Sequence, residues 1–250
     1  MAAMVRVQSL CTHLAVAAGG AALALGLARR ARLSYSHSGN AETYEPLNAE
    51  RLPQSPYELL QHWIADAEKS SGFLEAHAMT LATCDAEGGA TARTVVLQAV
   101  GEEHGGIMFG SNRFSLKARQ ATADGRAEAV LRFGQRQARI RGTLRLDEAK
   151  SAASFGRVAP KARVGLTVLE QGKPVDEATH AKLAAQIDEQ LLRGQEDSLV
   201  EPPASYVAFV LKPSSFEFYN GGHPAYLNDR FLYVRAKDGV RFDLPVRLQA

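Results

Sequence analysis

The sequence predicts a mostly β protein, a small antiparallel barrel that carries helices on its outside. Short runs of apolar or alternating residues recur between residues 78 and 235, and turn-forming residues bound them. Six or more such runs are present, with helical patterns inserted between them. Short strands that are joined by turns and interrupted by helices are typical of a small barrel.

The first predicted element is a helix over residues 56–70. A capping box, SPYE, begins at Ser55 and places proline at the first helical position, and apolar residues follow at helical spacing. Residues 78–84, AMTLATC, have the pattern of a buried strand. Turn-forming residues follow at once, so residues 92–99 are predicted to be the return strand.

The middle of the chain is predicted to contain three strands and a helix. Residues 107–111 predict a third strand, and residues 115–122 predict a helix. Residues 127–133 and 137–146 predict two more strands. The last of these alternates apolar with mostly basic residues, so we expect one apolar face toward the core and a basic face outward.

The C-terminal part is predicted to begin with two helices. Residues 147–156 have helical composition, and residues 176–193 carry leucine and isoleucine at four-residue spacing after the N-cap candidate Asp176. A Pro-Pro pair then breaks the chain. The remaining strand patterns cover residues 206–212, 215–219 and 230–235, with a Gly-Gly loop between the last two.

Composition excludes several classes of protein. The formal net charge is +2, from 29 basic and 27 acidic residues, so nothing indicates nucleic acid as a partner. Cys11 and Cys84 are the two cysteines, and they lack CxxC or Cys/His spacing. We therefore expect neither a disulfide framework nor a metal site, and a reducing compartment is the simplest interpretation.

The first 45 residues differ in composition from the rest. No acidic residue precedes Glu42, whereas four arginines do. Residues 14–28 are apolar but shorter than the ~20 residues of a membrane-spanning helix. An organellar presequence, a signal peptide and a weak membrane anchor all fit. The composition favours a mitochondrial or plastid targeting presequence, with a membrane-anchored or cytoplasmic protein as alternatives, and a folded domain over residues 46–250.

The most informative stretch runs from Arg93 to Lys117. It contains RTVVLQ, then IMFGSN, then RFSLK, where a strand meets a helix. Arg93, Ser111, Ser115 and Lys117 supply a guanidinium fork, two hydroxyl donors and an ammonium, and all four can point at one anion. The sequence therefore predicts a phosphate-binding site.

This stretch resembles the FMN phosphate site of the pyridoxine/pyridoxamine 5'-phosphate oxidase family. That family usually has R-x-V-L-L-K, then F-x-T-N, then S-R-K; here Gln98 replaces the first Lys and Leu116 the later Arg. The segment AMTLATCDAEGGATARTVVLQ resembles the family's first two barrel strands. The tail FEFYNGG…LNDRFLY resembles its C-terminal block, E-F-W-Q-G…R-L-H-D-R. Residues 46–250 are identified as a divergent member of this family.

The resemblance implies a fold, a cofactor and an activity. The fold is an FMN-binding split β-barrel, antiparallel and Greek-key, that forms a homodimer with FMN at the interface and uses residues 205–250 as a dimerisation block. The implied activity is that of an oxidoreductase in vitamin B6 salvage. The flavin takes a hydride from a phosphorylated B6 vitamer, which becomes pyridoxal 5'-phosphate, and passes the electrons to O2. The implied partners are a small-molecule substrate and a second copy of the chain.

The resemblance also assigns residues. The positions that it implies for FMN binding are Arg93, Val95, Val96, Gln98, Ser111, Ser115, Lys117, Gln137, Gln171, Tyr219 and Arg230. The family's vitamer-phosphate ligands fall on Gln98, Ser154, Val158 and Ala162, and Arg157, Lys161 or Arg163 can substitute after a register shift.

The family's catalytic Arg and His fall on Tyr226 and Asn228, so the catalytic residues stay unassigned. Two hypotheses remain open. One is a flavoenzyme with a remodelled pocket, acting on a B6 vitamer or another small molecule. The other is a flavin- or B6-binding protein without turnover.

Overall fold

The computed structural model of the protein describes residues 45–194, 201–223, 225 and 227–250. The predictions for residues 1–44 and for Tyr226 lie outside these ranges. Within the described ranges, no helix combines the length and the apolar character that crossing a bilayer requires.

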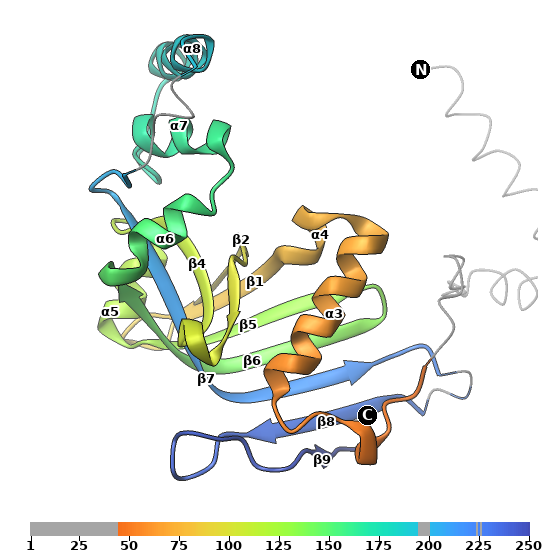
Figure 1. Ribbon diagram of the computed structural model, residues 1–250. Coiled ribbons are helices and arrows are strands. Elements are labelled where there is room, and N and C mark those ends of the chain that lie inside the picture. The colour runs from red at the N-terminus through yellow and green to blue at the C-terminus, as the bar shows by residue number, and fades with distance from the viewer. Residues whose placement is uncertain (1–44, 195–200, 224, 226) are drawn as a thin grey trace, which may run out of the picture. The chain divides into compact units, whose positions relative to one another are not determined.

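A single antiparallel sheet forms the body of the folded domain (Figure 1). Its strands follow the order β2-β1-β5-β6-β7-β4-β3, with β8 paired to β7 and β9 paired to β8. β2 and β3 lie at the two ends of this order and do not pair with each other, so the sheet curls without closing. The strands are β1 (Ala78–Cys84), β2 (Ala90–Val96), β3 (Ala99–Gly101), β4 (Gly106–Asn112), β5 (Arg126–Phe133), β6 (Arg136–Asp147), β7 (Tyr206–Asn220), β8 (Asp229–Val234) and β9 (Val246–Arg247).

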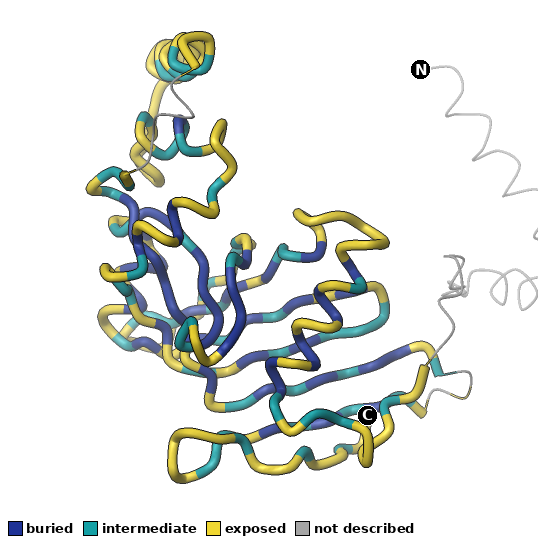
Figure 2. The backbone as a smooth tube through the Cα atoms, in the orientation of Figure 1, coloured by how far each residue is buried: buried dark blue, intermediate teal, exposed yellow. Residues whose placement is uncertain are grey.

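Helices lie outside the sheet, as the sequence predicts. The α-helices are α3 (Pro56–Ser71), α4 (Phe73–His77), α5 (Leu116–Ala123), α6 (Ser151–Gly156), α7 (Pro160–Val168) and α8 (Glu177–Leu192). Short 3-10 turns are η1 (Ala49–Arg51), η2 (Glu102–His104) and η3 (Glu148–Lys150). α7 and α8 project away from the sheet, and α8 contains no buried residue, as the yellow and teal tube of Figure 2 shows.

The core lies between the concave face of the sheet and α3. Trp63 of α3 is 2% exposed and meets Phe133 and Phe218 edge-on, at ring-centroid distances of 6.3 and 5.2 Å. In β6, Ala138, Ile140 and Leu144 are fully buried, whereas Arg139 is half-buried and Arg141 and Arg145 are exposed. The predicted division of this strand into an apolar and a basic face is therefore confirmed.

Two predicted strands have different bounds in the structure. The predicted strand 92–99 corresponds to β2, which spans Ala90–Val96. Leu97 N still donates to His77 O, next to β1, but Gln98 N donates to Met108 O of β4, and Ala99 begins the separate strand β3. The predicted strands 206–212 and 215–219 form the single strand β7. The register between β6 and β7 shifts at Arg141/Gly142, where β7 has one extra residue, Ser214, and this irregularity accommodates Pro213 within the ladder.

The helical region after β6 also differs from the prediction. The expected helix over residues 147–156 begins as the 3-10 turn η3 and becomes α-helical only in α6. The sequence did not predict α7, whose first residue is proline and which buries Val164. The helix predicted over residues 176–193 is confirmed as α8, and Asp176 caps it by accepting from Thr179 N at 2.7 Å.

Candidate functional site

Arg93 lies on the core-facing side of β2, directly opposite Leu81 of β1. Its Nη1 donates to Thr83 Oγ1 at 2.6 Å and its Nη2 donates to Thr91 Oγ1 at 2.6 Å. Gln120 of α5 accepts from both threonine hydroxyls, at 2.6 and 2.9 Å. Strand pairing and α5 thus hold the guanidinium in place through neutral oxygen atoms.

Lys117 lies in the first turn of α5 and is 6% exposed. Its Nζ donates to Ser111 Oγ, at the end of β4, at 2.8 Å, and to Gln171 Oε1 at 3.4 Å. Ser111 Oγ also donates to Gln171 Oε1 at 3.3 Å. The structure thus brings together two of the residues that the sequence predicts for the phosphate, Ser111 and Lys117, and places beside them Gln171, which the resemblance assigns to the cofactor.

Ser115 occupies the N-cap position of α5 without capping it. The residue is 7% exposed, and its buried Oγ has no hydrogen-bond partner among the residues that the structure describes. A buried hydroxyl without a partner is unfavourable, and the N-terminus of a helix carries a partial positive charge. An anion bound here would accept a hydrogen bond from the Ser115 hydroxyl and would be attracted by the helix N-terminus.

Burial and, to a smaller extent, the positive charge of Arg93 together lower the pKa of Lys117 to about 8. Burial also lowers the pKa of Arg93. In the part of the chain that the structure describes, neither cation forms an ion pair with a carboxylate (their partners are hydroxyls, amide oxygens and a carbonyl). Buried charges are usually paired, so this arrangement suits an anion such as phosphate.

Gln137, Tyr219 and Arg230, which the resemblance assigns to the flavin ring, form one row across β6, β7 and β8. Gln137 is directly opposite Tyr219, and Tyr219 is directly opposite Arg230. Their neighbours Ala138 and Phe218 are fully buried, so this row faces outward.

One chain therefore does not bring the ring row and the phosphate residues together, because they lie on opposite faces of the sheet. Val95 packs partly against the core and Val96 is 43% exposed at the sheet edge. The side chain of neither valine offers a polar group to a ligand.

Gln98, a position of both predicted sites, belongs to a ring of three neutral side chains. Ser154 Oγ donates to Gln98 Oε1 at 2.5 Å, and Gln98 Nε2 donates to Tyr206 Oη at 3.3 Å. Because Ser154 donates its only hydroxyl proton to Gln98, the hydroxyl of Tyr206 must be the donor to Ser154 Oγ, at 2.8 Å. Burial raises the pKa of Tyr206, which keeps the phenol protonated and able to donate.

Sequence reasoning missed Tyr206, and also Thr83, Thr91 and Gln120. A signal for Tyr206 was present in Gly110, a glycine inside a predicted strand. A Cβ atom there would lie 1.6 Å from the tyrosine hydroxyl, so only glycine leaves room for the ring.

The remaining predicted substrate residues do not gather into one site. Val158 follows α6, and Ala162 is exposed on α7. Arg157 Nη1 donates to the backbone carbonyl of Gln98 at 3.3 Å, which places a guanidinium beside the neutral ring. Asn228 Oδ1 accepts from the His223 backbone at 3.3 Å and thereby shapes its own loop.

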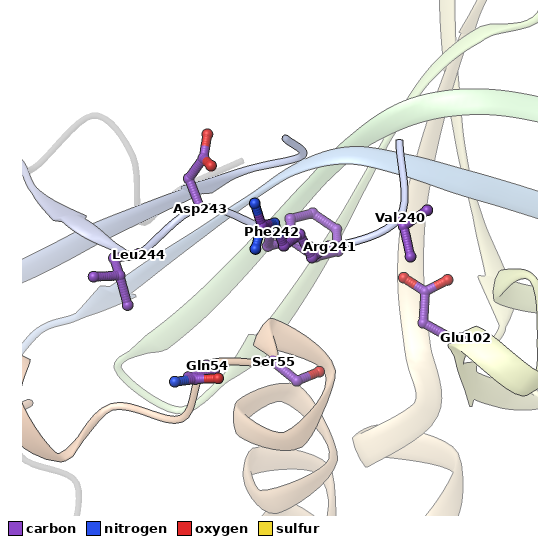
Figure 3. Close-up of a pocket in the computed structure, with 8 residues that line it drawn as sticks. All are labelled: Gln54, Ser55, Glu102, Val240, Arg241, Phe242, Asp243 and Leu244. Carbon is purple, nitrogen blue, oxygen red and sulfur yellow. The ribbon is translucent and has the colours of Figure 1, made fainter. Parts of the chain in front are cut away.

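A prominent hollow lies elsewhere on the molecule. The hollow in Figure 3 has a volume of about 550 Å³ and lies between the start of α3, Glu102 and residues 240–244. It contains none of the predicted site residues. The hollow therefore does not coincide with the predicted site residues.

Comparison with known proteins gives consistent results. A pyridoxine/pyridoxamine 5'-phosphate oxidase of Pseudomonas paraeruginosa is 32% identical over 203 residues, which cover 79% of this chain and 91% of the relative. The Deinococcus deserti enzyme of the same name is 31% identical over 216 residues, or 85% of this chain and 95% of the relative. No protein-family model matches the chain.

Two solved structures share the fold. PhzG from Burkholderia lata, in complex with tetrahydrophenazine-1-carboxylic acid, aligns with a TM-score of 0.71 at 23% identity, covering 85% of this chain and all of that one. A pyridoxamine 5'-phosphate oxidase-related FMN-binding protein from Nostoc punctiforme aligns with a TM-score of 0.63 at 18% identity, covering 78% and 98%. The open antiparallel sheet and these relatives together show that the chain belongs to the pyridoxine/pyridoxamine 5'-phosphate oxidase family and has its split-barrel fold.

Proposed function

We propose that the chain binds FMN and acts as an FMN-dependent oxidoreductase on a small molecule. The observation that carries the proposal is a pair of cations, the half-buried Arg93 and the buried Lys117, without a carboxylate partner in the described residues. Ser111 and the unsatisfied Ser115 hydroxyl complete a donor set that fits a terminal phosphate. When bound, FMN accepts a hydride and passes the electrons on, and the protein's residues bind and orient it.

The proposal includes a homodimer. Within one chain the ring row of Gln137, Tyr219 and Arg230 faces away from the phosphate donors. A second copy can present its ring row to the flavin whose phosphate the first copy holds. Residues 205–250 carry Tyr219 and Arg230, which supports their role in the dimer.

For the substrate, we propose a pocket remodelled from that of the B6 vitamer oxidases. The aligned phosphate positions hold the neutral ring of Gln98 and Ser154 with Tyr206, and Arg157 is the nearby cation that the structure shows. A phosphate dianion is bound most strongly by charged donors. The pocket therefore suits a B6-like or other small molecule that carries less negative charge than a phosphate dianion.

The second candidate is a flavin- or B6-binding protein without turnover. It is favoured by the replacement of the family's catalytic Arg and His by Tyr226 and Asn228. An asparagine amide does not titrate as an imidazole does, so it cannot transfer a proton in the same way.

Flavin uptake and flavin reduction test these proposals in order. The purified chain is expected to be yellow, or to become yellow on addition of FMN. A colourless protein that takes up no FMN would overturn the flavin proposal. Anaerobic addition of pyridoxamine 5'-phosphate should then bleach the flavin absorbance of an oxidase. FMN binding without bleaching by this compound, or by related small amines and alcohols, supports the protein without turnover.

FMN affinity is expected to decrease above pH 8. Lys117, with a pKa of about 8, is charged at pH 7 and mostly neutral at pH 9, and a bound phosphate favours the charged form. Affinity at pH 9 should be about tenfold weaker than at pH 7, and binding at pH 8.5 should take up protons. Calorimetry in buffers of different ionisation enthalpy measures both. In the control variant Lys117→Met, binding should be weak at both pH values; the same tenfold decrease there would contradict the assignment.

A further inference from the structure

Two threonines on neighbouring strands hold the guanidinium of Arg93. Thr83 of β1 and Thr91 of β2 are directly opposite each other, and Arg93 follows Thr91 by two residues, so the three side chains share one face of the sheet. Arg93 donates to each threonine hydroxyl at 2.6 Å. A guanidinium contains no acceptor, so each hydroxyl keeps its own proton, which needs an acceptor elsewhere.

Gln120 of α5 supplies the acceptor for both protons. Its Oε1 accepts from Thr83 Oγ1 at 2.6 Å and from Thr91 Oγ1 at 2.9 Å, and lies 3.4 Å from Arg93 Nη2. The amide cannot be turned around in this position, because its NH2 group would then face a guanidinium that only donates. The hydroxyl of Thr83, which is 1% exposed, would also lose the acceptor that the structure gives it.

Helix α5 contributes two side chains of different kinds to this region. Lys117 and Gln120 are three residues apart, lie on one face of the helix and are both buried. Lys117 brings a positive charge, whereas Gln120 is neutral. A neutral oxygen fixes the guanidinium of Arg93 without cancelling its charge, and a carboxylate at the same point would both fix it and cancel it.

We propose that Gln120 is a positioning residue for the phosphate. By accepting both threonine protons it fixes the Arg93 guanidinium, and because it is neutral it leaves the positive charge of Arg93 to the anion. The proposal rests on the proposed FMN phosphate site. It assigns Gln120 no contact with FMN, so the effect of removing its side-chain oxygen must act through Arg93.

Two substitutions separate the position of Arg93 from its charge. Gln120→Met keeps the length of the side chain but removes the acceptor. FMN affinity should decrease about three- to tenfold, since binding must then immobilise the guanidinium. Gln120→Glu keeps the acceptor but adds a carboxylate that pairs with Arg93, and the affinity should decrease about ten- to a hundredfold, as for the loss of a charged hydrogen bond. Fluorescence titration of FMN against the 250-residue chain measures both.

The stability of the same two variants should follow the opposite order. Gln120→Met leaves the buried hydroxyl of Thr83 without its acceptor, which is unfavourable. Gln120→Glu retains that acceptor, so its urea midpoint without FMN should lie above that of Gln120→Met. A merely structural role predicts one order for both properties. FMN binding that is tighter in Gln120→Glu than in Gln120→Met would therefore overturn the proposal.

A double-mutant cycle tests whether Gln120 acts through Arg93. In the Arg93→Ala background, the further change Gln120→Met should alter FMN affinity by less than about twofold, because the group that Gln120 positions is already gone. Losses that simply add in the double variant would show that Gln120 affects FMN by another route, and the proposal would be wrong.

Gln61 provides the matched controls. It is an exposed residue of α3 whose Nε2 donates to Val100 O at 2.8 Å, and Gln61→Met and Gln61→Glu should both leave FMN affinity unchanged. Wild-type affinity in Gln120→Glu, together with weakened binding in Arg93→Ala, would overturn the proposal and leave the phosphate site standing. Equal affinities of the wild type and Arg93→Ala would mean that the phosphate site itself is wrong, and the proposal with it.

Discussion

Replacing Arg93 by Ala is expected to weaken FMN binding about ten- to a hundredfold, or about 1.5–3 kcal/mol for a charged hydrogen bond. The substitution removes one of the two positive charges of the candidate phosphate site, the half-buried one. It also leaves Thr83, Thr91 and Gln120 without the guanidinium that they surround. Fluorescence titration of FMN against the purified variant measures the loss.

The control for this prediction is Arg126→Ala. Arg126 pairs with Asp124 at the surface, with a side-chain exposure of 69%, so its loss should leave FMN affinity unchanged. Equal affinities of Arg93→Ala and the wild type would place the phosphate elsewhere on the protein.

Arg93→Ala also provides a test of the shared site. If each flavin needs Arg93 from one copy and Tyr219 from the other, Arg93→Ala and Tyr219→Ala are each defective alone. Random pairing of the two variants restores about a quarter of the sites, because half of the dimers are mixed and each has one intact site. No recovery on co-expression would indicate that both residues act within one chain, or that Tyr219 is not a ligand.

Replacing Trp63 by Ala is expected to destabilise the folded domain by about 3–5 kcal/mol, the usual cost of deleting a large buried aromatic side chain. Trp63 joins α3 to the sheet through Phe133 and Phe218, and Arg136 stacks over its ring at 5.5 Å. The cavity left behind lies between helix and sheet, where neither element can collapse to fill it. Equilibrium unfolding in urea measures the change.

Phe73→Ala is the matched control for Trp63. Phe73 is 56% exposed and stacks on His77, so its removal should lower the free energy of unfolding by at most about 1 kcal/mol. A similar change in both variants would mean that α3 does not depend on Trp63 for its packing.

The sequence predicts those elements whose pattern is set by local chemistry. The alternation in β6, the proline at the start of α3 and the Asp176 cap of α8 correspond directly to burial and helix starts in the structure. The predicted capping box of α3 was wrong in one respect, because Ser55 is the N-cap residue but its side chain forms no capping hydrogen bond. The predicted end of β2 was wrong, because Leu97 and Gln98 are apolar or neutral like their neighbours. The change of partner at Gln98, whose backbone N–H donates to Met108 of β4, ends the pairing with β1, and no residue type indicates it.

The candidate phosphate site was predictable from the sequence where it consists of charged and hydroxyl side chains. Two cations and two hydroxyls within 25 residues predict that an anion binds there, and in the structure Lys117 Nζ lies 2.8 Å from Ser111 Oγ. Gln120 and Tyr206 are neutral and could not be predicted in this way, because their hydrogen-bond partners Thr83 and Gln98 come close only in the folded chain. The outward direction of Tyr219 and Arg230 follows from strand pairing, which the sequence alone does not fix.

The ring of Gln98, Ser154 and Tyr206 has a consequence for how this pocket can evolve. Each member gives one proton to the next and receives one, so any single replacement leaves a donor and an acceptor unmatched. A change at one position is therefore selected against until the others change with it. Restoring the lysine of the B6 oxidases at position 98 should require compensating substitutions at positions 154 and 206, so their mutational effects should be strongly epistatic.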